Sequence, residues 1–220
     1  VVSKATKVDI IVTPAVTIIS GVSIGTLLGP VINNLMSGLG KTIMLATSLQ
    51  PFWMGIVISV IVGIVLTLPI SSAALCMMLS LAGLAGGAAT AGCSAQMIGF
   101  AVMSFKENGW SGLLAQGLGT SMLQIPNILK NWKIWIPPTL ASAITGPIAT
   151  TIFKMENIPL GSGMGTSGLV GQIGTITAMG EAGASAFTIY TGIVVVHFVL
   201  PALLSLISVS YTHLRAHETD

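Results

Sequence analysis

The stretch Phe52–Ile70, FWMGIVISVIVGIVLTLPI, decides the fold class of this chain. It carries no charged side chain, begins with an aromatic pair and reaches Pro69 at its end. About 20 apolar residues are enough to cross the hydrocarbon core of a bilayer, and aromatic residues concentrate at the membrane interface. The stretch therefore predicts a transmembrane helix.

The composition of the whole chain agrees with a location in the lipid bilayer. Only 6% of its 220 residues are charged, whereas a soluble domain carries about 25%. The mean hydropathy is +0.94, and no Asp, Glu, Lys or Arg occurs between Thr42 and Phe105. A soluble protein with a very apolar core would need a polar surface that this sequence lacks. We therefore expect a multi-pass integral membrane protein.

Charge and cysteine content argue against several other classes of protein. The formal net charge is +2 with no basic cluster, so nothing in the sequence resembles a nucleic-acid-binding surface. Cys76 and Cys93 both lie among apolar and small residues, and we interpret them as reduced packing residues rather than a disulfide. Two cysteines without further ligands do not make a metal site. We expect neither a metal nor a cofactor.

Further apolar segments extend the pattern along the chain. The segment Ile10–Leu35 contains glycines at four-residue spacing, which favours close helix packing in a membrane. We expect Ser71–Phe105 to form two short or tilted helices and Trp110–Ile125 to form a re-entrant or interfacial helix. The other two apolar segments are Trp135–Phe153 and Ala184–Ile207. The sequence therefore predicts an all-α polytopic membrane protein, with about six transmembrane helices and Gly-rich re-entrant or broken-helix segments.

Two connections can be placed from the sequence. Pro14 and Pro30 predict kinks or ends in the first segment, and Asn33 begins a connection that includes Lys41. The stretch from residue 125 to 138, IPNILKNWKIWIPP, places two lysines among tryptophans. Lys and Trp together are typical of a membrane interface, and the excess of positive charge predicts that this connection faces the cytoplasm.

The two ends of the chain are unlike a complete protein. The first residues, VVSKATKVD, lack a starting Met and predict a fragment that begins inside a longer protein. Residues Ser208–Thr219, SVSYTHLRAHET, read like the translation of a sequencing-library adapter and hold Arg215, the only Arg of the chain. We therefore expect one transmembrane domain over residues 1–207 and a non-native tail over 208–220.

A glycine-rich stretch, Glu156–Gln172 or ENIPLGSGMGTSGLVGQ, contains the string G-x-G-x-x-G at Gly163, Gly165 and Gly168. A dinucleotide site needs a strand before this string, a helix after it and an acidic residue about 20 positions further on. Here an apolar span precedes it, and the next acid, Glu181, comes too early. The nucleotide interpretation is therefore rejected.

The same stretch suits a solute-binding segment. Irregular backbone at membrane depth is tolerated where protein buries it or where it lines a watery cavity, and broken helices form solute sites in transporters. A sugar needs many neutral hydrogen-bond partners, which Thr166, Ser167, Gln172, Thr175 and Thr177 offer. Close helix packing by small residues is the alternative. The candidate substrate-binding residues are Glu156, Asn157, Gly163, Gly165, Thr166, Ser167, Gln172, Glu181 and His197.

Three of these candidates are ionisable, and each has a structural alternative. Glu181 lies among apolar and small neighbours, where a carboxylate tends to be functional. Glu156 could instead be an interfacial residue beside Lys154, and His197 could be a hydrogen-bonded packing residue in the last span. Sixteen residues of helix would hold Glu181 and His197 about 24 Å apart, so we do not expect them to pair unless the chain bends.

Three stretches together resemble a known family: ENIPLGSGMGTSGLVGQIGT, GGAATAGCSAQMIGFAV and LQIPNILKNWKIWIPP. They are similar to the enzyme IIC family of the phosphotransferase system, in the branch named for the perfringolysin O regulator, over nearly all of residues 1–207. The resemblance implies a homodimeric inner-membrane permease that binds and translocates a sugar. A separate IIB protein, supplied with phosphate through IIA, would phosphorylate that sugar.

The resemblance is looser at individual residues. Sugar-transporting relatives contact the sugar through a motif with a Glu, and a His is also implicated. Glu156, followed by Asn157, Ile158 and Pro159, is the closest match, and no G-I-T-E string occurs. Two alternatives stay open: a membrane sensor that regulates gene expression without transport, and an ion-coupled secondary carrier that uses Glu181.

Overall fold

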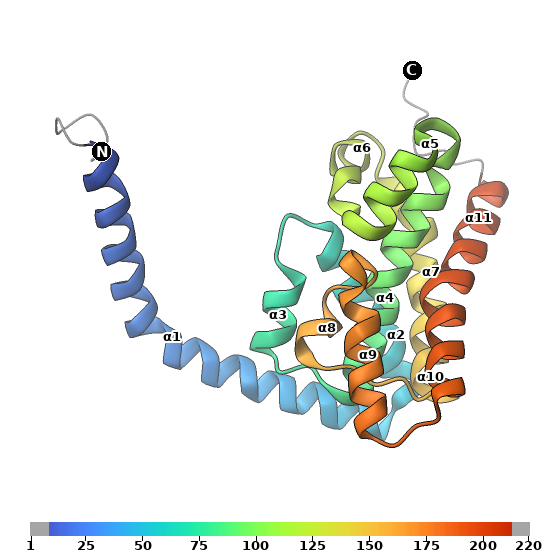
Figure 1. Ribbon diagram of the computed structural model, residues 1–220, viewed down its shortest axis with the longest axis horizontal. Coiled ribbons are helices and arrows are strands. Elements are labelled where there is room, and N and C mark those ends of the chain that lie inside the picture. The colour runs from blue at the N-terminus through green and yellow to red at the C-terminus, as the bar shows by residue number, and fades with distance from the viewer. Residues whose placement is uncertain (1–8, 213–220) are drawn as a thin grey trace.

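A computed structural model describes residues 9–212, and every element named in that range is a helix (Figure 1). Three helices pack most extensively against one another: α2 (Pro51–Thr67), α4 (Gly83–Met103) and α7 (Ile136–Pro147). Helix α11 (Leu200–Thr212) covers α4 and α7 from another side. Nearly every residue of α4 is buried, so this helix forms the centre of the molecule.

Small residues allow the central helices to approach so closely. A side chain at Gly92 of α4 would fall on the backbone of Ser59 in α2. A side chain at Gly146 of α7 would meet Ser59 and the carbonyl oxygen of Gly55. Contacts between small residues are the usual basis of helix packing in membranes. The glycine and alanine residues of α4 therefore allow its close packing against α2 and α7.

Buried polar side chains cross-link the same helices. Ser59 Oγ donates to the carbonyl oxygen of Ser142 at 2.8 Å, and Ser142 Oγ donates to that of Gly92 at 3.2 Å. The fully buried Gln96 of α4 accepts from Trp135 Nε1 at 3.1 Å. Buried polar groups are costly when they lack partners, so these bonds fix the mutual positions of the helices.

The N-terminal helix α1 (Asp9–Leu49) departs from the sequence prediction. We expected a connection from Asn33 through Lys41, but the helix continues through both residues. Pro14 and Pro30 lie inside it, and the ribbon changes direction along its length, as expected of prolines in a helix interior (Figure 1). The prediction of an interruption was wrong because helix formation satisfies the backbone hydrogen bonds of the intervening polar residues locally.

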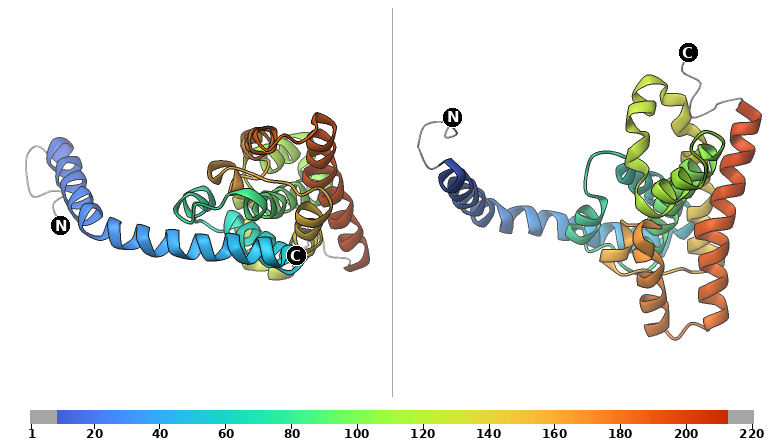
Figure 2. Two further views of the ribbon diagram at one scale, coloured as in Figure 1. Left: turned by 90° about the horizontal axis from the view of Figure 1, so that it is seen from below. Right: turned by 45° about the horizontal axis from the view of Figure 1, so that its top comes forward.

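Most of α1 stands away from the other helices (Figures 1 and 2). Its packing contacts are with α2, α4 and the short helix α3 (Ser72–Met78). Among the described residues, no atom lies within 4 Å of the place where a Cβ atom at Gly21 would lie. The expected packing face therefore has no partner at Gly21 in this part of the chain. The surroundings of Gly25 and Gly29 lie outside the described side chains.

Short and irregular helices connect α4 to α7. The prediction of two helices between residues 71 and 105 is confirmed by α3 and α4, although α4 has 21 residues and is not short. The segment Trp110–Ile125, which we expected to be re-entrant or interfacial, is divided among α5 (Phe105–Leu114), the π-helix η1 (Ala115–Gly119) and the 3-10 turn η2 (Ser121–Gln124). The connection that follows forms α6 (Ile125–Lys130) and the 3-10 turn η3 (Trp132–Trp135).

The C-terminal part continues the helical pattern with interruptions. A π-helical stretch, η4 (Ile148–Ile152), extends α7. The glycine-rich segment follows as α8 (Pro159–Ser162), the 3-10 turn η5 (Ser167–Leu169) and α9 (Val170–Glu181). The last span consists of α10 (Ala186–Gly192), the π-helix η6 (Ile193–Val199) and α11, which runs to Thr212. The expected non-native tail falls largely on 213–220, outside the described residues.

One helix in the described chain is long and apolar enough to cross a membrane, Ala186–Val209, with 24 residues. Two further apolar helices, Pro14–Ser23 and Pro51–Thr67, are shorter than that criterion requires. The all-α class is confirmed among the described residues. Six spans stay a prediction, because within the described residues only Ala186–Val209 meets the criterion of length and hydropathy.

Candidate functional site

Asn157 holds the glycine-rich segment together. Its Nδ2 group lies 2.6 Å from Thr90 Oγ1, 2.9 Å from the carbonyl oxygen of Gly171 and 3.2 Å from Thr175 Oγ1. Its Oδ1 accepts from the backbone N–H of Ile158 at 2.8 Å. The side chain is buried, and these contacts join α4 to α9. They give Asn157 a structural role, while contact with a solute stays a prediction.

Two predicted glycines allow the segment to lie close to its neighbours. The carbonyl oxygen of Gly163 accepts from Ser72 Oγ at 2.6 Å, and a side chain here would overlap the backbone of Ser72. Gly165 has a φ of +53°, and its Cβ would come within 2.7 Å of Cys93. A positive φ is a conformation that glycine adopts without steric cost. At these positions the structure supports the packing alternative.

Thr166 and Ser167 connect the glycine-rich segment to the π-helix η1. Thr166 Oγ1 donates to the carbonyl oxygen of Gly117 at 2.5 Å, and Ser167 Oγ donates to that of Gly119 at 2.9 Å. The two hydroxyls therefore join the glycine-rich segment to η1 by two direct hydrogen bonds.

Gln172 and His197 form a buried polar pair between α9 and η6. Gln172 Nε2 lies 3.1 Å from His197 Nδ1, and with the amide as donor the histidine proton resides on Nε2. Neither Gln172 Oε1 nor His197 Nε2 has a hydrogen-bond partner among the described residues. Both side chains are buried, with 5% and 0% exposure. Unsatisfied buried polar atoms are costly, so the pair has unused capacity to bind a polar group.

The two acidic candidates are not part of this pair. Glu156 is half-buried beside Asn157, and Glu181 is exposed at the end of α9. Neither carboxylate forms a salt bridge or a side-chain hydrogen bond within residues 9–212. The chain does bend after Glu181, at Gly183, yet the residue that reaches His197 is Gln172.

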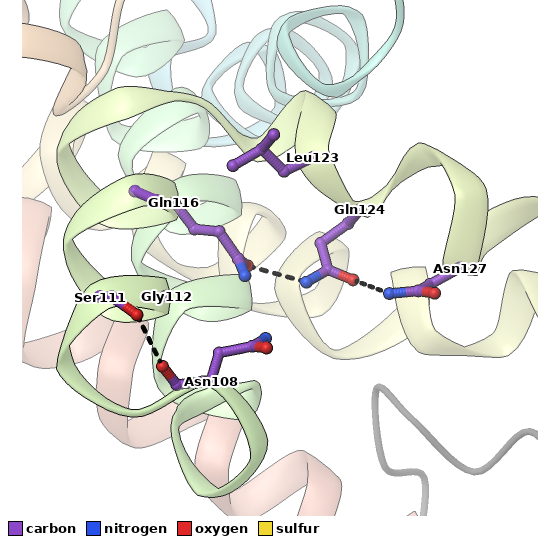
Figure 3. A pocket seen from close by; sticks show the side chains of 8 residues that line it. Asn108, Ser111, Gly112, Gln116, Leu123, Gln124 and Asn127 are labelled. Atoms are coloured by element: carbon purple, nitrogen blue, oxygen red, sulfur yellow. Dashed lines mark hydrogen bonds between the residues drawn. The ribbon is translucent and has the colours of Figure 1, made fainter.

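The structure also has a pocket that the sequence did not predict. A cavity of about 400 Å³ opens among α5, η1, η2 and α6 (Figure 3). Eight residues line this space, which we call the amide pocket: Asn108, Ser111, Gly112, Ala115, Gln116, Leu123, Gln124 and Asn127. Four of them carry a side-chain amide, and none is charged.

Hydrogen bonds arrange three of these amides in a row. Gln124 Nε2 donates to Gln116 Oε1 and Asn127 Nδ2 donates to Gln124 Oε1, each at 2.9 Å (Figure 3). Gln116 Nε2 in turn donates to Ser104 Oγ, also at 2.9 Å. Each amide fixes the orientation of the next one. In the sequence, the only indication is the presence of several neutral amides in one moderately apolar stretch, and their spacing follows no regular period.

Other chemistries have little support in the described part of the chain. Residues 9–212 hold no group of three or more His, Cys, Asp or Glu side chains that could bind a metal ion. The free thiols of Cys76 and Cys93 are buried among core residues, as expected for packing residues. The candidate sites therefore depend on neutral hydrogen-bonding groups.

Comparison with known proteins gives one result for the whole chain. No curated protein and no solved structure matches it. A family model described as "Phosphotransferase system, EIIC" matches residues 1–219. This family consists of membrane-integral, permease-like subunits for sugar transport. Since the match covers essentially the full length, the chain belongs to the phosphotransferase system EIIC family.

Proposed function

We propose that this protein is a permease subunit that binds a sugar or a similar small polar solute and translocates it across the cytoplasmic (inner) membrane. The observation that carries the proposal is the family match over residues 1–219. A separate IIB protein, which receives phosphate through IIA, phosphorylates the solute. We also propose that the protein belongs to the perfringolysin O regulator-like branch of the family and forms a homodimer. Both of these proposals rest on the sequence resemblance alone.

Within the predicted set, Gln172 and His197 are the residues we propose to contact the solute. Their unpartnered atoms support this role, because a sugar hydroxyl both donates and accepts hydrogen bonds. Glu156 stays a candidate through its local sequence. Asn157, Gly163, Gly165, Thr166 and Ser167 hold the glycine-rich segment in place, so they would act on the solute through the backbone of this segment. Glu181 is exposed and stays a candidate through its local sequence alone.

Transport assays with the full-length protein test the proposal. We would measure uptake of labelled sugars into right-side-out and inverted vesicles, with and without phosphoenolpyruvate and the general phosphotransferase proteins. The expected result is accumulation of sugar phosphate that depends on the phosphoryl donor. Uptake without a donor that follows a proton or sodium gradient and is lost in Glu181→Gln would favour the secondary carrier. Binding without flux under every condition would favour the sensor.

A variant at the buried pair tests the proposed contact. His197→Phe keeps a ring of similar size but removes both nitrogens, and we expect the rate of donor-dependent uptake to fall at least about tenfold, which corresponds to about 1.4 kcal/mol. Tyr190→Phe is the matched control, because it removes an exposed hydroxyl from the preceding helix. Equal uptake rates in the two variants would remove His197 from the site.

A further inference from the structure

The amide pocket lies at one end of the molecule. Helices α5 and α6, which contribute to it, lie near the C-terminal end of α11, while the turn between α9 and α10 lies at the opposite end (Figures 1 and 2). Helices α10 and α11 belong to Ala186–Val209, the apolar helix of spanning length in the described residues. The pocket is therefore placed near one mouth of the membrane-spanning body, away from the buried Gln172–His197 pair.

The inner wall of the pocket is rigid. Gln116 and Gln124 are almost completely buried, with 4% and 2% exposure, and their amides bond to each other and to Ser104. A buried network whose members satisfy one another has one preferred orientation. Hydrogen-bonding groups next to this wall are therefore already oriented before a ligand arrives, which lowers the entropic cost of binding.

Unused hydrogen-bonding groups border the open space. Asn127 Oδ1 has no partner among the described residues, and neither does the side-chain amide of Asn108. Figure 3 shows Asn108 extending into the space beside the row of amides, with Leu123 on another side. These residues offer neutral donors, neutral acceptors and one apolar surface.

This combination selects a class of ligand. Amide donors and acceptors match hydroxyl groups, which both donate and accept, and the apolar Leu123 suits the C–H face of a ring. No charged side chain lines the pocket, so an anion or a cation would find no counter-charge. A volume of about 400 Å³ lies within the range of small-molecule sites. We infer that the amide pocket is a second binding site, which holds a neutral polyhydroxylated solute at the mouth of the translocation path.

The π-helix η1 connects this site to the glycine-rich segment. It contributes Ala115 and Gln116 to the pocket wall, and its Gly117 and Gly119 carbonyls accept from Thr166 and Ser167. Single π-helical turns occur frequently at functional sites. The wall of the pocket and the segment that leads to Gln172 are therefore joined by two hydrogen bonds.

The inference rests on the proposed function, since the solute class is that of a sugar permease, but binding at the pocket is measured separately from transport. We would measure equilibrium binding of labelled neutral sugars and sugar alcohols to the purified full chain in detergent, with sugar phosphates as charged comparators. All variants are built on His197→Phe, the parent protein of this test, so that binding at the Gln172–His197 pair does not mask the pocket. Ala115→Phe fills the pocket from an exposed position, and Asn108→Ala removes one free amide. Leu114→Phe and Asn34→Ala are matched controls outside the pocket.

Relative to the His197→Phe parent, we expect Ala115→Phe to raise the Kd at least about tenfold and Asn108→Ala to raise it about fivefold, the effect of one lost hydrogen bond. The controls should bind like the parent. If the parent binds a neutral sugar and both pocket variants bind it equally well, the inference is overturned while the proposed function stands. Binding that is lost in the pocket variants, in a protein whose wild-type form never shows uptake, would support the inference and overturn the transport function. A parent that binds only charged sugars, or no sugar, overturns the inference.

Discussion

At the scale of single residues, Asn157 is the most heavily used polar side chain of the glycine-rich segment. It bonds to Thr90, Gly171, Thr175 and Ile158 from a buried position. Its neighbours leave no room for a larger group, since side chains at Gly161 and Gly174 would run into its amide. One amide therefore determines how α4, α8 and α9 come together.

We predict that Asn157→Leu destabilises the protein by about 2–4 kcal/mol. The change leaves the Ile158 N–H without its acceptor and removes the hydrogen bonds from Asn157 Nδ2 to Thr90 and Gly171. An unsatisfied buried group costs about 1–3 kcal/mol, and each lost hydrogen bond costs about 1 kcal/mol. Thermal unfolding in detergent can be followed with a thiol-reactive dye, because Cys76 and Cys93 are buried until the protein unfolds. Asn34→Leu, at an exposed position of α1, should change the midpoint little. Equal midpoints for the two variants would contradict the prediction.

Sequence reasoning pointed to residues here but not to their protein partners. Thr166 and Ser167 were singled out for their hydrogen-bonding groups and Asn157 as the neighbour of Glu156, and in the structure all three donate to protein acceptors, while contact with a solute stays a prediction. Which acceptor a side chain meets depends on contacts between distant segments, and the sequence does not encode those contacts as a local pattern. The amides of the pocket were missed for the same reason, since irregular turns bring Gln116 and Gln124 together.

At the scale of elements, the packing of α4 against α2 depends on the absence of side chains. Gly92 faces the backbone of Ser59, and Gly87 faces the backbone of Met155 in the segment before α8. Backbones at such distances gain dispersion contacts along the whole crossing. A single methyl group at a crossing point would separate the helices.

We predict that Gly92→Ala costs about 1–3 kcal/mol of stability, the usual range for overpacking, and lowers the unfolding midpoint in detergent. The matched control is Gly180→Ala in α9, where the added methyl group meets no atom within 4 Å. Alanine favours a helix by up to about 1 kcal/mol over glycine, so the control should be neutral or slightly stabilising. A midpoint for Gly92→Ala at or above that of the control would show that the crossing adjusts without cost.

Helices formed by a continuous run of apolar residues could be predicted from the sequence. Elements whose backbone geometry depends on packing against other helices could not. The helix expected at Phe52–Ile70 is found as α2, and the last expected span corresponds to α10, η6 and α11. The continuation of α1 past Asn33 was not predicted, since Asn and Gly are weak helix formers and intrinsic propensity is a weak guide. The π-helical stretches have no sequence signature, because they arise where packing forces an extra residue into a turn.

At the scale of the whole molecule, the two ends of the spanning helix differ in charge. Lys130 and Lys133 lie at the end that carries α6, and Glu181 lies at the opposite end, where α9 turns into α10 (Figure 1). Positive residues favour the cytoplasmic side of a membrane. The end with the amide pocket is therefore expected to face the cytoplasm.

We predict that a cysteine at Leu129, which is 82% exposed, reacts with a membrane-impermeant maleimide in inverted vesicles but not in intact cells. A cysteine at the exposed Ala182 should show the opposite pattern. The two native cysteines are fully buried and should give little background. Labelling of both positions from the same side would overturn the assignment of the two ends.

The enclosure of α4 also has a consequence for biosynthesis. Of the helices that surround it, α2 is made before α4, whereas α7 and α11 emerge from the ribosome later. Until Trp135 and Thr139 arrive, Gln96 lacks two of its partners and would face lipid or translocon components instead. Because chains are made from the N-terminus onward, the central helix must wait for the second half of the protein, and a chain that stops before α7 should become a substrate for membrane quality-control proteases.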